Sequence, residues 1–152
     1  MTARTYAAIS GALYVALGIA GFVPALWEHP PADATLSIKA FHASLLGVFV
    51  VNIILTMTHL TIGVWGAMAA NNNYSALVFT RGSTILFVLM GIAGLIPYHV
   101  INNVYGTAPL YGNNVWLHLG CAAIGLFFSL RPGLNFTDVG MQEQMNPHQP
   151  HK

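Results

Sequence analysis

Two long stretches of this sequence carry no charge, because no Asp, Glu, Lys or Arg lies between Lys39 and Arg81 or between Arg81 and Arg131. Charged residues make up 6% of the chain, against about 25% in a soluble domain. A helix that crosses a bilayer needs about 20 mainly apolar residues. The sequence therefore predicts a polytopic membrane protein with four spans, at residues 6–26, 43–69, 77–98 and 110–130. Five Lys and Arg residues cannot form a basic face, which excludes nucleic acid as a partner.

The basic residues predict how these spans are oriented. Four of them fall on one side of the membrane: Arg4, Arg81, Arg131 and Lys152. The first loop on the opposite side has charges of both signs, and the second loop there has none. Because Lys and Arg are enriched in cytoplasmic loops, we expect both termini to lie in the cytoplasm.

The chain also contains an internal repeat. "GIAGFVP" at 18–24 recurs 73 residues later as "GIAGLIP" at 91–97, and eight of the nineteen positions aligned around it are identical. The repeat predicts an all-α, four-helix bundle of two tandem parallel hairpins, at about residues 1–70 and 74–133. Together they would form one domain, 1–133, followed by a polar cytoplasmic tail, 134–152. The first span could pass for a signal peptide, but since it is repeated we expect it to stay in the mature protein.

Three motifs carry a resemblance to a known family. They are "YxxxxGxxYxxLGxxG" at 6–21, "VNxxxxxxHLxxGxxG" at 51–66 and "NNVWLHL" at 113–119. In these motifs the chain resembles the small four-helix bacterial membrane proteins grouped as domain of unknown function 4383. The resemblance implies a duplicated four-helix fold in a bacterial inner, intracytoplasmic or thylakoid membrane. It implies no established activity.

Two histidines stand at matching positions of the repeat, each on a helix face of small residues. With the spacing i, i+4, i+7 and i+11, the two faces are His59, Gly63, Gly66, Ala70 and His118, Ala122, Gly125, Ser129. Small residues let membrane helices approach closely. One interpretation is therefore tight packing, in which each imidazole bonds a backbone carbonyl or a hydroxyl such as that of Thr56 or Ser83.

A second interpretation is a tetrapyrrole site, either b-type haem or chlorophyll. Imidazole is a common axial ligand of haem iron, so His59 and His118 would be the metal ligands. The room for the macrocycle would come from four small residues: Gly63, Gly66, Ala122 and Gly125. A third interpretation, a small channel or carrier, follows from the rule that ionisable groups inside a membrane are functional candidates.

The sequence contains no recognisable catalytic set, neither a nucleophile with its base, nor a phosphate loop, nor a pair of acids. We therefore expect a non-enzymatic protein in the lipid bilayer, acting as an accessory or scaffold subunit that binds other membrane proteins or itself. The uncharged loop at 99–114 is rich in turn residues and amides and is the expected surface for a partner.

Overall fold

The computed structural model describes residues 2–30, 32, 33 and 35–130. Over this range the chain is mostly helical, in agreement with the predicted all-α class, although it also contains a small sheet. In chain order the elements are α1 (Ala3–Ala20), a 3-10 turn (Pro24–Leu26), β1 (Trp27–Glu28), β2 (Ala43–Leu45), β3 (Phe49–Val51), α2 (Ile53–Ala69), α3 (Asn73–Leu95), α4 (His99–Asn102) and α5 (Asn113–Ser129). The predicted tail, 134–152, and the end of the predicted domain lie outside the described residues.

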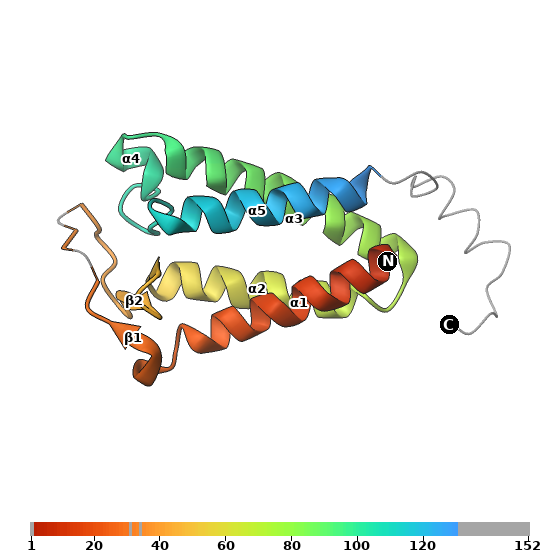
Figure 1. Ribbon diagram of the computed structural model, residues 1–152, viewed down its shortest axis with the longest axis horizontal. Coiled ribbons are helices and arrows are strands. Elements are labelled where there is room, and N and C mark those ends of the chain that lie inside the picture. The colour runs from red at the N-terminus through yellow and green to blue at the C-terminus, as the bar shows by residue number, and fades with distance from the viewer. Residues whose placement is uncertain (1, 31, 34, 131–152) are drawn as a thin grey trace, which may run out of the picture.

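Four long helices form two antiparallel pairs. α1 packs along α2, and α3 packs along α5, while the contacts between the two pairs are far fewer and involve mainly α1, α2 and α3. Figure 1 shows the pairs as two layers, with the strands and the short α4 gathered at one end. The interior of each pair is therefore more closely packed than the boundary between the pairs.

Polar side chains define where three of the helices begin. The Thr2 hydroxyl, the Asn52 amide oxygen and the Asn72 amide oxygen each accept a hydrogen bond from the backbone N–H three residues later. Such caps satisfy one of the four backbone donors that a helix leaves free at its start. At the same end of the molecule as the α2–α3 turn, Arg4 Nε donates to the Ala70 carbonyl over 2.9 Å.

Two of the helices, α1 and α3, are long and apolar enough to cross a membrane, and α2 is a shorter apolar helix. The predicted spans at 43–69 and 110–130 were wrong at their starts. α2 begins only at Ile53 because residues 43–51 are paired as strands, and α5 begins at Asn113. The first span was too long, since α1 ends at Ala20 and Pro24 opens a 3-10 turn.

An antiparallel sheet, not predicted from the sequence, joins the end of α1 to the start of α2. β2 lies between β1 and β3, with Leu45 opposite Trp27 on one side and Phe49 on the other. The turn between β2 and β3 places Leu46 and Gly47 in the left-handed region, at φ 54° and 69°. We call the described parts of 24–52 and 98–112 the loop cap.

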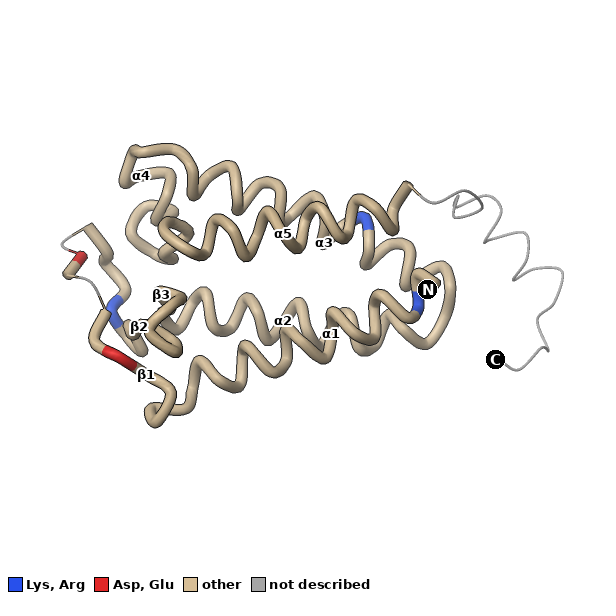
Figure 2. Tube along the Cα trace, in the orientation of Figure 1, with Lys and Arg blue, Asp and Glu red and all other residues tan. Residues whose placement is uncertain are grey.

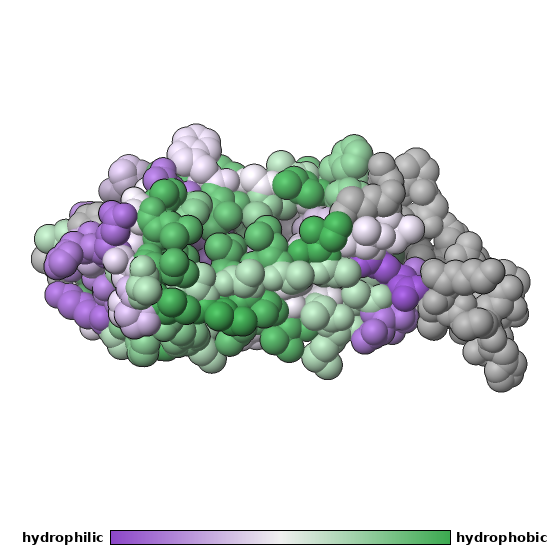
Figure 3. All heavy atoms as spheres, turned by 60° about the horizontal axis from the view of Figure 1, so that its bottom comes forward, coloured by the Kyte–Doolittle hydropathy of each residue, from purple (hydrophilic) through white to green (hydrophobic). Residues whose placement is uncertain are grey.

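The surface divides into polar ends and an apolar middle. Among the described residues, Arg4 and Arg81 lie toward one end of the bundle, and Glu28, Asp33 and Lys39 lie in the loop cap (Figure 2). Between these ends all four long helices expose large apolar side chains, here called the apolar belt: Ile9, Leu13, Val64, Met68, Ile85, Leu89, Ile124 and Phe127. Figure 3 shows one face on which hydrophobic residues cover the middle of the molecule. Such a surface suits contact with lipid.

Candidate functional site

The two histidines of the repeat meet at the boundary between the helix pairs. His59 on α2 and His118 on α5 have ring centroids 5.9 Å apart with their planes tilted by 50°. Both side chains are buried, with 3% and 0% of their surface exposed. The structure thus brings together the two candidate ligands that the sequence singled out.

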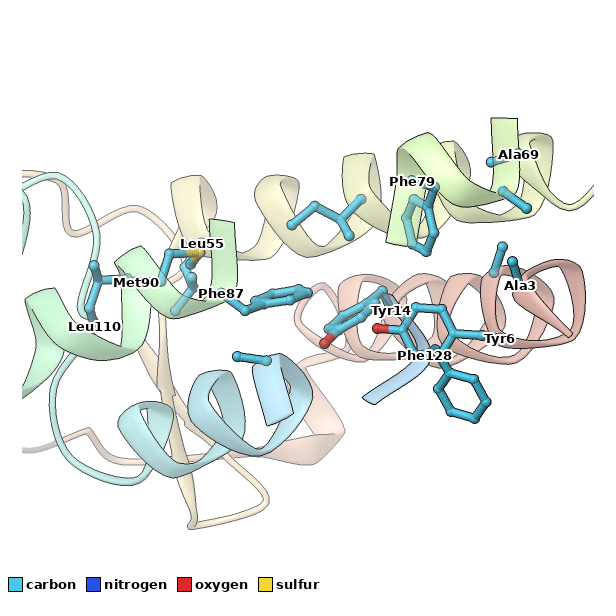
Figure 4. Close-up of a cluster of buried hydrophobic side chains, with 14 of the residues drawn as sticks. Ala3, Tyr6, Tyr14, Leu55, Ala69, Phe79, Phe87, Met90, Leu110 and Phe128 are labelled. Atoms are coloured by element: carbon cyan, nitrogen blue, oxygen red, sulfur yellow. The ribbon is translucent and has the colours of Figure 1, made fainter. Parts of the chain in front are cut away.

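Two aromatic rings outside the sequence motifs of the histidines complete the centre of the bundle. Tyr14 stacks on His59 with centroids 6.0 Å apart, and Phe87 stacks on His118 at 5.9 Å. Tyr14 and Phe87 also stack on each other at 4.9 Å, side by side within the buried cluster of Figure 4. We call these four residues the central ring cluster. One feature of the sequence could have identified these two rings: Tyr14 and Phe87 are 73 residues apart and so occupy aligned positions of the repeat.

Several polar atoms in and beside the central ring cluster have no hydrogen-bond partner among the described residues. They are Thr56 Oγ1, His59 Nε2, Asn114 Oδ1 and both nitrogens of His118. The Tyr14 hydroxyl lies beside the Cys121 thiol. The expected bonds from the imidazoles to a Thr56 or Ser83 hydroxyl are not formed. The Thr56 hydroxyl is itself unpaired, and Ser83 Oγ donates weakly to the Thr80 carbonyl over 3.3 Å.

Polar groups nearer the Arg4 end are satisfied in a different way. The hydroxyls of Ser10, Thr80, Thr84 and Ser129 each donate to a carbonyl four residues earlier on the same helix, over 2.6–2.8 Å. This is the usual arrangement for Ser and Thr inside helices. The unpaired atoms lie in the central ring cluster, in the adjoining half of the bundle and in the loop cap itself, at Trp27, His42 and Asn102.

Neighbouring helices fill the space next to the small residues that lie beside the histidines. A Cβ added to Gly66 would lie 2.7 Å from the Phe79 ring and 2.9 Å from Gly11 Cα, and one added to Gly63 would meet the backbone of Tyr14 and Val15. On α5, a Cβ on Gly125 would meet Thr84 and the Tyr6 hydroxyl, and Ala122 is buried. These two faces of small residues serve close helix packing, and a macrocycle would fit between the helices only if they separated. Tetrapyrrole ligation by His59 and His118 stays a prediction.

Buried asparagines hold the loop cap together across the helix pairs. Asn52 Nδ2 donates to the carbonyls of Ile38 and Thr107, over 2.9 and 2.6 Å. Asn114 Nδ2 donates to the carbonyls of Val50 and Pro109, over 2.6 and 2.8 Å. Several amides of the 99–114 loop that we expected to face a partner are thus buried: Asn102, Asn103 and Asn114. What this loop exposes is largely apolar or aromatic, and Tyr105 is the extreme case at 79%.

One carboxylate in the loop cap is strongly stabilised in its charged form. Partial burial favours neutral Asp33, but hydrogen bonds from Thr35, Tyr111 and the backbone of Thr35 and Leu36 outweigh that effect and lower its pKa to about 2. Burial lowers the pKa of His42 as well; the charge of Asp33 opposes this shift and that of Lys39 adds to it. Asp33 is therefore ionised over the whole physiological pH range.

These features define a helical protein with the character of a membrane protein, built from two tightly packed helix pairs around a buried histidine pair. A family model described as a domain of unknown function (DUF4383) matches residues 4–130. The chain belongs to this family, as its motifs suggested. No curated protein and no solved structure matches the chain.

Proposed function

We propose that this chain is a non-enzymatic integral membrane protein with four spans and both termini in the cytoplasm, and that it works as an accessory or scaffold subunit. The observation that carries the proposal is the apolar belt, which all four long helices share between two polar ends. In water a belt of this kind would drive aggregation. In a bilayer it is the surface that lipid requires.

The lengths of α2 and α5 are compatible with spanning. Each has 17 residues, about 25 Å at 1.5 Å per residue, against about 30 Å of hydrocarbon. Apolar chain continues from both helices into the loop cap, through β3 ahead of α2 and through Ala108–Leu110 ahead of α5. Arg4 and Arg81 lie toward the opposite end, which supports a cytoplasmic location for that end.

The contacts inside the two helix pairs support the proposed duplication. Three close approaches in the first pair recur in the second at the aligned positions: Gly18–Leu60 with Gly91–Leu119, Gly21–Thr56 with Gly94–Val115, and Gly11–Gly66 with Thr84–Gly125. The stacking of Tyr14 on His59 likewise corresponds to that of Phe87 on His118. Aligned residues also meet each other at the boundary, as His59 and His118 do, which is expected for a twofold relation between hairpins.

The outward face of α1 supports a role in binding another membrane helix. Ala8, Ala12 and Ala16 follow one another at every turn and are exposed. Small residues are enriched where membrane helices pack because they let the backbones approach. The interior face of α1 uses the same device toward α2, at Gly11 and Gly18. The exposed alanines therefore suit a second copy or another subunit.

A topology experiment tests the proposal. In a Cys121→Ala background, single cysteines at Asn71 and at Tyr105 are labelled in intact cells with a membrane-impermeant maleimide. We expect the cysteine at Tyr105 to react and the one at Asn71 to react only after the membrane is opened. Labelling of both, or recovery of the protein in the soluble fraction, would contradict the four-span arrangement.

The unpaired nitrogens of His118 favour a second function, tetrapyrrole binding, with His59 and His118 as axial ligands to b-type haem or chlorophyll. Its test is the absorption spectrum of gently purified protein. A Soret band that disappears in His118→Ala would support this function, whereas a colourless, folded protein would exclude it.

A further inference from the structure

We propose that the base of the loop cap is a lipid-binding surface, seated where headgroups meet acyl chains in the leaflet opposite the cytoplasm. Four apolar side chains carry this contact and are here called the left-handed rim: Phe41, Leu46, Val104 and Tyr105. The inference rests on the proposed four-span arrangement. It goes further, because it assigns to phospholipid a region whose loop composition suggested a protein partner.

The first observation is the backbone of the left-handed rim. Among the described residues, its four members are the non-glycine residues in the left-handed region, with φ between 49° and 56°. Large side chains are disfavoured there, and a β-branched one such as that of Val104 is a clear outlier. Turns in water place Gly, Asn or Asp at such positions. The chain therefore keeps a strained backbone at four points and displays an apolar side chain at each of them.

These side chains are not needed for the interior of the protein. They are between 40% and 79% exposed, so packing inside the bundle does not explain them. Phe41 and Leu46 lie in the loop between α1 and α2, and the other two members lie in the loop between α3 and α5. Both layers of helices in Figure 1 thus contribute to the rim. Lipid surrounds the bundle and meets both layers, which suits this distribution better than a partner on one side.

The apolar surface of the helices leads to the rim. At the helix ends next to the loop cap, Leu95 of α3, Ile54 of α2 and Trp116 of α5 are exposed. Tyr98, just after α3, is exposed as well. Trp and Tyr are enriched where a membrane meets water. The rim is therefore the continuation of the apolar belt, and the same lipid covers both.

The lengths of two helices agree with this depth. α2 and α5 have 17 residues each, or about 25 Å, which leaves about 5 Å of a hydrocarbon layer of about 30 Å to be covered by other parts of the chain. Both helices begin at the loop cap, whereas α2 ends at a polar turn, residues 71–73. Glu28 and Lys39 are exposed in the loop cap, and their charges keep it from sinking deeper than the headgroups.

The hydrogen bonds of the loop cap suit a position next to lipid. Irregular backbone at membrane depth is tolerated only where its polar groups are satisfied by protein or water. Here Asn52 and Asn114 donate to four carbonyls of the loops. The Gly106 carbonyl accepts from the N–H groups of Ser37 and Ile38, over 2.8 and 3.1 Å. A loop in water has no need for so many internal partners.

The experiment is spin-label accessibility on the full-length protein in phosphatidylcholine nanodiscs. Single cysteines replace Phe41, Leu46 or Val104 in the Cys121→Ala background, and each label is exposed to oxygen, which concentrates in lipid, and to a water-soluble nickel chelate. Labels at Leu89, in the apolar belt, and at Asn71, in the exposed polar turn, are the controls. We expect the rim labels to collide severalfold more with oxygen than with nickel. Tyr105 is omitted because its phenol would lie at headgroup level, where water-soluble reagents still reach.

Two outcomes would overturn the inference. Rim labels that behave like the label at Asn71 would place the loop cap in water, and rim labels shielded from both reagents would place it against protein. If the label at Leu89 also behaves like the one at Asn71, the four-span proposal itself fails. The two failures are therefore distinguishable.

A pair of substitutions gives a second measurement that does not put folding at risk. Leu46→Asn and Val104→Asn introduce a residue that adopts the left-handed region more readily, so the turns are retained while the apolar side chains are lost. We expect the bilayer thickness that gives the highest unfolding temperature to fall by roughly 2–5 Å, up to the length that the rim covers. Gly112→Asn is the control, because Gly112 is also left-handed, at φ 65°, and has open space around an added Cβ. An unchanged optimum in both rim variants would contradict the lipid contact.

Discussion

The Tyr111 hydroxyl donates a hydrogen bond to Asp33 Oδ2 over 2.6 Å and so joins two loops 78 residues apart in the sequence. The other carboxylate oxygen accepts from the Thr35 backbone N–H and hydroxyl, over 2.8 and 2.6 Å. Asn103 Nδ2 then donates to the Thr35 hydroxyl over 2.7 Å. A single carboxylate therefore organises the contact between the loops of the two helix pairs.

This arrangement predicts a dependence of stability on pH. The pKa of Asp33 in the folded protein is about 2, below its ordinary value of 3.8. A carboxyl whose pKa is lowered by folding stabilises the protein above its unfolded pKa, and that stabilisation is lost as the pH falls through the window between the two values. Thermal unfolding in nanodiscs should therefore occur at lower temperature as the pH falls from about 4 to 2. Asp33→Asn should lower the stability at neutral pH and flatten this dependence; an equally steep dependence in the variant would contradict the assignment.

The close approach of α1 to α2 predicts a difference between two glycine substitutions. Gly63→Ala places a methyl group against the backbone of Tyr14 and Val15, and overpacking of this kind costs about 1–3 kcal/mol. Gly120→Ala is the matched control, because no atom lies within 4 Å of its added Cβ, and alanine in a helix is favoured over glycine by roughly 0.5–1 kcal/mol. The measurement is the free energy of unfolding in mixed micelles. Equal stability of the two variants would show that the pair is less tightly packed than described.

Asn52 is predicted to be the most costly amide to remove from the loop cap. Its oxygen accepts from the Leu55 N–H at the start of α2, and its nitrogen donates to two carbonyls from different loops. Asn52→Ala loses a helix cap and leaves two partly buried acceptors unpaired, for about 2–4 kcal/mol in total. Asn52→Asp should restore only the cap and recover part of the loss. Asn71→Ala, at an exposed turn, should change the unfolding free energy little.

The outward alanines of α1 give a prediction for assembly. Ala12→Ile adds bulk in the middle of the exposed small face, so the backbones of two helices could no longer approach there. We expect the variant to fold normally but to lose self-association or co-purification with its partner subunit. Ile85→Phe is the control, since Ile85 is exposed on α3 and lies outside this face. Unchanged assembly in Ala12→Ile, measured by cross-linking in native membranes, would exclude this face as the contact.

The helical class and the main helices were predictable because long apolar runs leave the chain few alternatives. α3 corresponds closely to the predicted third span, and α1 matches the first span except that it ends six residues earlier. The sheet at 27–51 was missed because its residues are as apolar as a membrane helix, and a short apolar run does not distinguish a strand from a helix. The β-branched Val50 and Val51 were the signal that favoured a strand.

The candidate site was predictable in its residues and less so in its surroundings. The repeat predicted that the two histidines lie at matching positions of their hairpins, and the structure adds that their rings lie side by side. The helices that pack against the two faces of small residues are set by how each hairpin is rotated about its axis. No local pattern in a single sequence gives this rotation. The role of Tyr14 and the absence of partners for the His118 nitrogens could be learned only from the packed structure.

The uneven packing of the four helices has a consequence for how the molecule is put together. Each hairpin closes on itself through backbone contacts at glycine, whereas the hairpins meet mainly through rings and a few loop bonds. We therefore expect each half to assemble as soon as it leaves the ribosome and the two to join afterwards. A chain split in the turn at Asn71 and expressed as separate fragments should reconstitute the whole bundle in a living cell.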